Sequence, residues 1–143
     1  MKKIVIIVRE LGDKFQSLSL FGLRLILAYG FYQPALSKLQ NIDSVAQWFS
    51  QLGYPFPLLS AYLAGITELL GVILLPLGLF TRLISIPLMF VMIVAIFTVH
   101  WEHGFPASQN GFEIPLYYFL MLFVLFSHGA GKLSLDNILF KKP

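Results

Sequence analysis

The sequence predicts an all-α integral membrane protein, an antiparallel four-helix bundle with a short interfacial amphipathic helix between the first and second spans. Of its 143 residues, 57% are hydrophobic and only 12% are charged, and the mean hydropathy is +0.79. Soluble globular domains carry about 25% charged residues, so this chain has too little charge to cover a surface that faces water. Long apolar stretches, with basic residues between them, support the same class. We expect a single domain over residues 1–143.

The first span is predicted over residues 15–38. Between Lys14 and Lys38 the sequence has 23 residues and one charge, Arg24. At about 1.5 Å per residue, such a helix crosses a hydrocarbon core of about 30 Å. The apolar run in the preceding segment, MKKIVIIVREL, is shorter than the core of a signal peptide. We therefore expect this segment to be retained as a lead-in at the membrane interface.

A short amphipathic helix is predicted over residues 43–53. Val45, Trp48, Phe49 and Leu52 recur with the spacing of one helical face. The segment is too short to cross a membrane, and its aromatic residues are typical of the interface. We expect it to lie along the membrane surface between the first two spans.

Three further apolar stretches predict the remaining spans, over residues 57–80, 83–100 and 112–129. Thr81 and Arg82 form the tight turn between the second and third spans. A polar, turn-rich loop, HWEHGFPASQNGFE, separates the third span from the fourth.

The basic residues predict the orientation of these spans. With four spans, Lys38 falls on one side of the membrane and Arg24 lies inside it. The other eight Lys and Arg residues fall on the opposite side: Lys2, Lys3, Arg9, Lys14, Arg82, Lys132, Lys141 and Lys142. The positive-inside rule then predicts a multi-pass protein of the cell inner (plasma) membrane, with both termini in the cytoplasm.

Glu68 is the one acidic residue in the middle of the second span. A charge at the bilayer centre costs about 2.5–3.5 kcal/mol on insertion scales, so Glu68 should face inward and be neutralised. Ala64, Gly71 and Gly78 share its helical face, and small residues let helices approach closely. We expect Arg24 in the first span to be its partner, which gives an intramembrane polar pair.

Three interpretations of Glu68 are open at this point. The pair with Arg24 is either a structural ion pair that fixes the register of the bundle, or an intramembrane site for a ligand, a proton or a quinone. In the third interpretation, the carboxylate is protonated and hydrogen-bonded to Thr67 or Tyr29.

Polar residues also gather at the outer end of the third span. His100, Glu102 and His103 lie within four residues. Imidazole and carboxylate groups suit several transition metals, but two histidines without a further sure ligand are a weak metal signal. Polar anchoring at the interface, beside Trp101, is the simpler interpretation.

A quinone site near the outer surface is the other interpretation of this end. Such a site needs an apolar slot for the tail and a few donors for the carbonyl oxygens. Lys38, His100, Glu113 and Tyr29 are the ligand-binding candidates. His128 lies at the opposite end of the bundle, where we expect it to cap helix carbonyls.

The order of several short motifs resembles the DoxX family of four-helix membrane proteins. The motifs are LRLILAYGFYQPALSKL, GYPFP, ITELLGVILLPLGLFTRL, MFVMIVAIFTVH and GFEIPLYYFLMLFVLFSHGAGKLSLD. The resemblance runs from about Leu23 to Leu139. It equates the family's polar positions with those of this chain: Arg24, Lys38, Glu68, the turn at Gly78, Leu79, Thr81 and Arg82, His100, Glu113 and the closing motif Gly129 to Asp136. Many members have a His-Gly pair where Pro34 and Ala35 stand here.

The resemblance implies a function in redox chemistry. The family name comes from a subunit of a thiosulfate:quinone oxidoreductase, and other members are implicated in oxidative-stress defence or membrane-protein maturation. We therefore expect a membrane subunit of a redox system that binds a quinone or a similar lipophilic molecule. The chain has no cysteine, which excludes cysteine-ligated clusters. Electrons would have to come from a redox partner protein that carries a cofactor.

Two other classes of function are consistent with the sequence. The chain could be a non-catalytic membrane scaffold or maturation accessory protein that docks a partner. It could also transport a small solute or protons, which would require a homo-oligomer because four short spans make a narrow bundle. In each case the bilayer is a partner, no nucleic acid is expected, and no metal is required.

Overall fold

The computed structural model describes residues 1–140, except for the side chain of Lys2. All regular structure in this range is helical, which confirms the all-α class. The α-helices are α1 (Lys2–Gln40), α2 (Ile42–Gln51), α3 (Pro57–Leu77), α4 (Thr81–Ala95), α5 (Glu113–His128) and α6 (Leu135–Leu139). Lys141 and Lys142, which contributed to the predicted orientation, lie outside the described residues.

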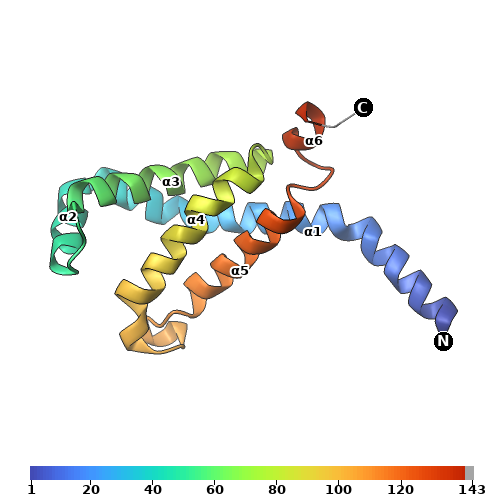
Figure 1. Cartoon of the computed structure of the whole chain (residues 1–143), viewed down its shortest axis with the longest axis horizontal. Helices are drawn as coiled ribbons and strands as arrows, with labels where there is room; N and C mark the ends of the chain where they lie inside the picture. The colour runs from blue at the N-terminus through green and yellow to red at the C-terminus, as the bar shows by residue number, and fades with distance from the viewer. Residues whose placement is uncertain (141–143) are drawn as a thin grey trace.

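The four long helices form two antiparallel pairs (Figure 1). α1 packs mainly against α3, and α4 packs mainly against α5. Their shared core consists of large apolar side chains that are almost fully buried: Leu27, Phe31, Leu75, Leu88, Leu122 and Leu125. α2 lies across the end where α1 leads into α3, and α6 lies near the opposite end (Figure 1).

The helices have the length and polarity of a membrane protein. Among the described residues, α3 and the continuous helical segment Thr81–His103 are long and apolar enough to cross a bilayer, and α5 is a shorter apolar helix. Large apolar side chains such as Leu83 and Phe90, each 65% exposed, face outward. An outer surface of this kind suits lipid, because a soluble protein rarely exposes so much contiguous apolar area. The crossing of the membrane by all four helices, and the position of α2 at the interface, stay predictions.

α1 is longer than the sequence predicted. The first span was expected to begin near Phe15, but the helix begins at Lys2 and continues for 39 residues. The charged residues of the lead-in are good helix formers in general, and they interrupt the apolar pattern without interrupting the backbone. The first part of the helix extends away from the other helices (Figure 1), and its apolar side chains from Ile4 to Leu18 are exposed.

Arg24 ties α1 to the end of α3 and to the segment after α5. Its side chain is fully buried. Nη1 donates to the carbonyl oxygens of Leu75 and Pro76 at 3.0 and 3.1 Å, and Nη2 donates to the carbonyl oxygen of Leu133. The last carbonyls of a helix lack the usual partners within the helix, so the guanidinium supplies a donor to Pro76 and a second donor to Leu75, which also accepts the Gly78 N–H.

Gly78 makes this contact sterically feasible. Its φ of +63° is left-handed, and a Cβ at this position would lie 2.2 Å from Nη1 of Arg24. Glycine adopts this conformation without strain, and it ends α3 so that the chain can turn into α4. Gly78 therefore allows both the turn into α4 and the close approach of the Arg24 side chain.

Asp136 at the start of α6 completes the same end of the molecule. Its carboxylate accepts hydrogen bonds from the backbone N–H groups of Phe80 and Thr81, at 2.7 and 3.0 Å. Its own N–H donates to the carbonyl oxygen of Gly78 at 2.9 Å. The first N–H groups of a helix lack partners and favour a negative charge, so a residue of the tail caps α4.

Replacing Asp136 with Ala should destabilise the protein, because the N–H groups of Phe80 and Thr81 lose their acceptor. Loss of a helix cap lowers the free energy of unfolding by about 1–2 kcal/mol. Thermal unfolding in detergent would measure the change. Asp13→Ala removes an exposed carboxylate from the projecting part of α1 and is the matched control. Equal effects of the two substitutions would show that the cap contributes nothing.

Replacing Arg24 with Leu should be more damaging, because the carbonyls of Pro76 and Leu133 lose the guanidinium donor and the Leu75 carbonyl loses one of its two donors. Each unsatisfied buried group costs about 1–3 kcal/mol, so we expect little folded protein after extraction. Arg9→Leu, on the exposed part of the same helix, is the control. Size-exclusion profiles and melting temperatures of both variants give the comparison. A well-folded Arg24→Leu variant would contradict the role of Arg24 given above.

Candidate functional site

A cavity of about 920 Å³ lies on the side of the molecule near α2. The second half of α1, α2, α3, α4 and the segment from Thr98 to Tyr118 all contribute to its lining. Most of the lining is apolar or aromatic: Phe31, Pro34, Trp48, Phe49, Leu63, Val91, Met92 and Ile114 are among its residues. Its volume lies within the usual range for small-molecule sites, and so does its combination of apolar walls with a few polar groups.

Tyr118 of α5 forms one wall of this cavity and packs against α1. Its ring meets the ring of Phe31 edge to face, with centroids 5.4 Å apart. A Cβ at Gly30 would lie 1.9 Å from the Tyr118 hydroxyl oxygen. The absence of a side chain at Gly30 therefore lets Tyr118 lie across α1 at the cavity.

Lys38 and Glu68 form an ion pair in the lining of the cavity. Nζ of Lys38 lies 2.9 and 2.8 Å from the two carboxylate oxygens of Glu68. The Glu68 side chain is only 3% exposed, whereas that of Lys38 is 20% exposed. Gly65 brings the helices together nearby, since a Cβ there would lie 2.9 Å from a methyl carbon of Leu39. The pair thus joins the last turns of α1 to the middle of α3.

The predicted pair between Arg24 and Glu68 was wrong. Arg24 binds the carbonyls of Leu75 and Pro76, and Glu68 pairs with Lys38. The reason is the antiparallel register of α1 and α3. Glu68 lies seven residues before Leu75, which is about 10 Å along the helix. That distance, together with the hydrogen bonds that hold Arg24, keeps the guanidinium away from the carboxylate.

His100 reaches the cavity at the end of a π-helical turn, Ile96–His100. Its Nδ1 lies 2.7 Å from the carbonyl oxygen of Asn110, which fixes the ring against the following loop. Turns of this kind change the direction of side chains within a helix and are frequent at functional sites. Because Nδ1 is engaged, Nε2 is the ring nitrogen left for another partner.

The other predicted ligand-binding residues lie elsewhere. Tyr29 is 84% exposed and is absent from the cavity lining. The carboxylate of Glu113 accepts hydrogen bonds from the Ala107 N–H and the Tyr117 hydroxyl, so it closes the loop before α5. Of the four candidates, only Lys38 and His100 line the cavity, together with Glu68.

The residues of the weak metal candidate do not converge. The helix changes from π to 3-10 geometry at His100, so His100 and His103 are not on one α-helical face. Nδ1 of His103 lies 3.1 Å from the carbonyl oxygen of Val99, and Glu102 is exposed. Within residues 1–140, no group of three or more His, Asp or Glu side chains is arranged to hold a metal ion.

Several cavity residues were not foreseen from the sequence. Tyr54 after α2 and Thr98 in the π-helical turn are hydrogen-bonded through their hydroxyl groups, 44 residues apart in sequence. Tyr118 was missed for a similar reason, since its partner Phe31 lies on another helix. Gly30 was the one signal in the sequence. A glycine within a helix can mark a place where another side chain comes close, but it does not identify that side chain.

A protein family and several known proteins are similar to this chain. The family model described as DoxX matches residues 19–101. Two proteins of Haemophilus influenzae, each named "Uncharacterized protein", are 34% and 36% identical over 127 and 135 residues. These matches cover 86% and 91% of this chain, and 84% and 97% of the relatives.

A third relative, from Bacillus subtilis, is named "Putative oxidoreductase CatD" and is 31% identical over 119 residues. That match covers 83% of this chain and 85% of the relative. No solved structure matches the chain significantly. Since the family model covers more than half of the chain and the relatives cover most of it, the protein belongs to the DoxX family of membrane proteins.

Proposed function

We propose that this protein is the membrane subunit of a redox system and that it binds a quinone, or a similar lipophilic carbonyl compound, in the cavity beside Lys38 and Glu68. The observation that carries the proposal is the position of a hydrogen-bonded ion pair in the wall of a large apolar cavity. A quinone needs an apolar slot for its ring and tail and a few donors for its carbonyl oxygens. The cavity has both.

The ion pair can offer a donor without losing its own stability. An ammonium group has three N–H donors, and two hydrogen bonds join Nζ of Lys38 to Glu68. The third N–H is left for a carbonyl oxygen of the ligand. Because Glu68 neutralises Lys38, the site offers a strong donor without placing an unpaired charge in an apolar environment.

The aromatic residues suit a planar ring. Trp48, Phe49, Tyr54 and Tyr118 all line the cavity. Aromatic faces stack with planar ligands and add about 0.5–1.5 kcal/mol per pair beyond the burial of area. His100, with Nε2 unengaged, is a second donor or acceptor at another part of the wall.

Electron transfer would need a partner protein. The chain has no cysteine, so it cannot hold a cysteine-ligated cluster, and a cofactor-bearing partner would reduce or oxidise the bound quinone. The name of the Bacillus subtilis relative supports an oxidoreductase system. The distribution of Lys and Arg supports a location in the inner membrane, with both termini in the cytoplasm.

Adding a quinone with a short tail, such as decyl-ubiquinone, should raise the melting temperature of the purified protein in detergent. A ligand that binds only the folded state stabilises it by about 2.7 kcal/mol at one hundred times its dissociation constant. Glu68→Gln should weaken this effect, because it alters the partner of Lys38. Glu10→Gln changes an exposed carboxylate on the projecting part of α1, away from the cavity, and should leave the shift intact. If the wild-type protein shows no saturable shift, the proposal fails.

Exchanging the charges of Lys38 and Glu68 tests the pair itself. Lys38→Glu or Glu68→Lys alone places two like charges together, and breaking a buried pair costs about 3–5 kcal/mol. The double substitution restores opposite charges and should recover part of the folded yield. The comparison pair is Arg24→Glu with Glu68→Arg, which should recover nothing because these residues are not in contact. Rescue by the second exchange instead of the first would contradict the structure.

A further inference from the structure

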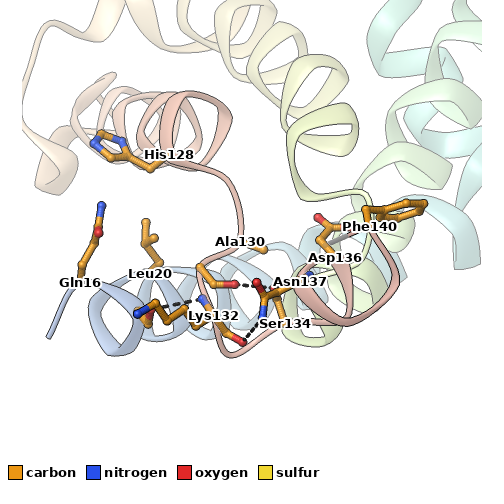
Figure 2. Close-up of a pocket in the computed structure, with 11 residues that line it drawn as sticks. Gln16, Leu20, His128, Ala130, Lys132, Ser134, Asp136, Asn137 and Phe140 are labelled. Carbon is orange, nitrogen blue, oxygen red and sulfur yellow. Dashed lines mark hydrogen bonds between the residues drawn. The ribbon is translucent and has the colours of Figure 1, made fainter. Parts of the chain in front are cut away.

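A second, smaller cavity of about 340 Å³ lies at the opposite end of the molecule, where the segment after α5 folds back onto α1 (Figure 2). Gln16, Ser17 and Leu20 of α1 form one side, and His128 at the end of α5 forms another. The rest is lined by the returning segment: Ala130, Gly131, Lys132, Ser134, Asp136, Asn137 and Phe140. None of these residues takes part in the site proposed for the quinone.

The returning segment is held in a defined position against α1. The backbone N–H of Lys132 donates to the hydroxyl oxygen of Ser17 at 3.2 Å. Gly131, with φ of +79°, passes so close to α1 that a Cβ would lie 3.3 Å from both Leu20 and the Ser17 backbone. The backbone of Lys132 is therefore held in a defined position at the edge of the cavity.

The carboxylate of Asp136 is already engaged, whereas Lys132 forms no ion pair among the described side chains and His128 keeps one ring nitrogen unengaged. Both carboxylate oxygens of Asp136 accept backbone N–H groups at the start of α4. Lys132 is exposed, and in residues 1–140 the one ion pair is that of Lys38 with Glu68. Nδ1 of His128 lies within hydrogen-bond distance of Ser127 Oγ and the Val124 carbonyl, which leaves Nε2 unengaged.

Further donors lie around the same opening. The side chain of Gln16 makes no hydrogen bond within the described part of the chain, and it lies on the same side of the view in Figure 2 as Lys132 and His128. Arg82 is nearby, since its Nε lies 3.3 Å from the point that a Cβ on Gly129 would occupy. Lys132, Gln16 and His128 thus line the cavity with groups that can donate hydrogen bonds, and Arg82, whose Nη2 donates to the Ser127 carbonyl oxygen, lies close to it.

An apolar surface continues from this opening along α1. Phe15 and Leu18 are 54% and 55% exposed and flank Gln16 and Ser17 in sequence. Acyl chains could lie on these side chains while a charged head group occupies the polar cavity. A ligand that matches both parts is anionic at one end and apolar at the other.

We propose that this cavity binds a phosphate group and that its natural occupant is the head group of an anionic phospholipid. Lysine binds phosphate as a point charge, and basic pockets between membrane helices hold the head groups of anionic lipids. Free phosphate shares this chemistry and is the alternative source of the same group. The proposal does not depend on quinone binding at the other end of the molecule.

The test uses the full chain in neutral detergent, with phosphatidylglycerol, phosphatidylcholine or inorganic phosphate added. Native mass spectrometry measures the bound lipid, and thermal unfolding measures stabilisation. The key variant is Lys132→Gln, which should fold normally because the side chain is exposed. Lys3→Gln removes the same charge from the projecting part of α1 and is the matched control. His128→Gln tests whether the imidazole of His128 also contributes to binding.

We expect the wild-type protein and Lys3→Gln to retain phosphatidylglycerol in preference to phosphatidylcholine. Lys132→Gln should reduce the affinity for phosphatidylglycerol about fivefold, the usual effect of one basic residue at an anionic lipid surface. Stabilisation by inorganic phosphate that depends on Lys132, without retained lipid, would support the phosphate site and identify free phosphate as its occupant. Equal retention of both lipids without a phosphate effect, or equal losses in Lys3→Gln and Lys132→Gln, would overturn the proposal.

Discussion

The buried guanidinium of Arg24 is the interaction on which the arrangement of the helices depends. It is fully buried in the interior of the molecule, and it binds carbonyl oxygens from two segments far apart in the sequence. In such an environment every polar group needs a partner, so the guanidinium and the carbonyls fix one another. The end of α3, the turn at Gly78 and the segment that leads to Asp136 are positioned by this requirement.

The end of the molecule near α2 contains the larger of the two cavities, and its polar groups line that open space. Lys38 and Glu68 neutralise each other in the wall of a large cavity, and they do not fill it. Buried hydrogen bonds around Arg24 maintain the fold, and the region near α2 contains the cavity in which we propose that a quinone binds. A fold does not by itself determine a function, which depends on the residues of each site.

The apolar runs in the sequence were sufficient to predict the helices of residues 42–51, 57–77 and 113–128 to within a few residues. The inward position of Glu68 also followed from sequence, since a lone carboxylate in an apolar span cannot face lipid. Its partner could not be predicted, because the choice between Arg24 and Lys38 depends on how far α1 and α3 slide past each other. The contact of Tyr54 with Thr98 depends on three-dimensional proximity in the same way.

The cap that Asp136 provides for α4 has a consequence for biogenesis. The acceptor lies 56 residues after Phe80, so α4 leaves the ribosome long before its first amide groups can be covered. An intermediate in which α4 and α5 have already paired therefore lacks this cap until the segment after α5 folds back. Until then, the N–H groups of Phe80 and Thr81 lack the carboxylate that accepts them in the complete structure, which distinguishes the unfinished protein from the mature one.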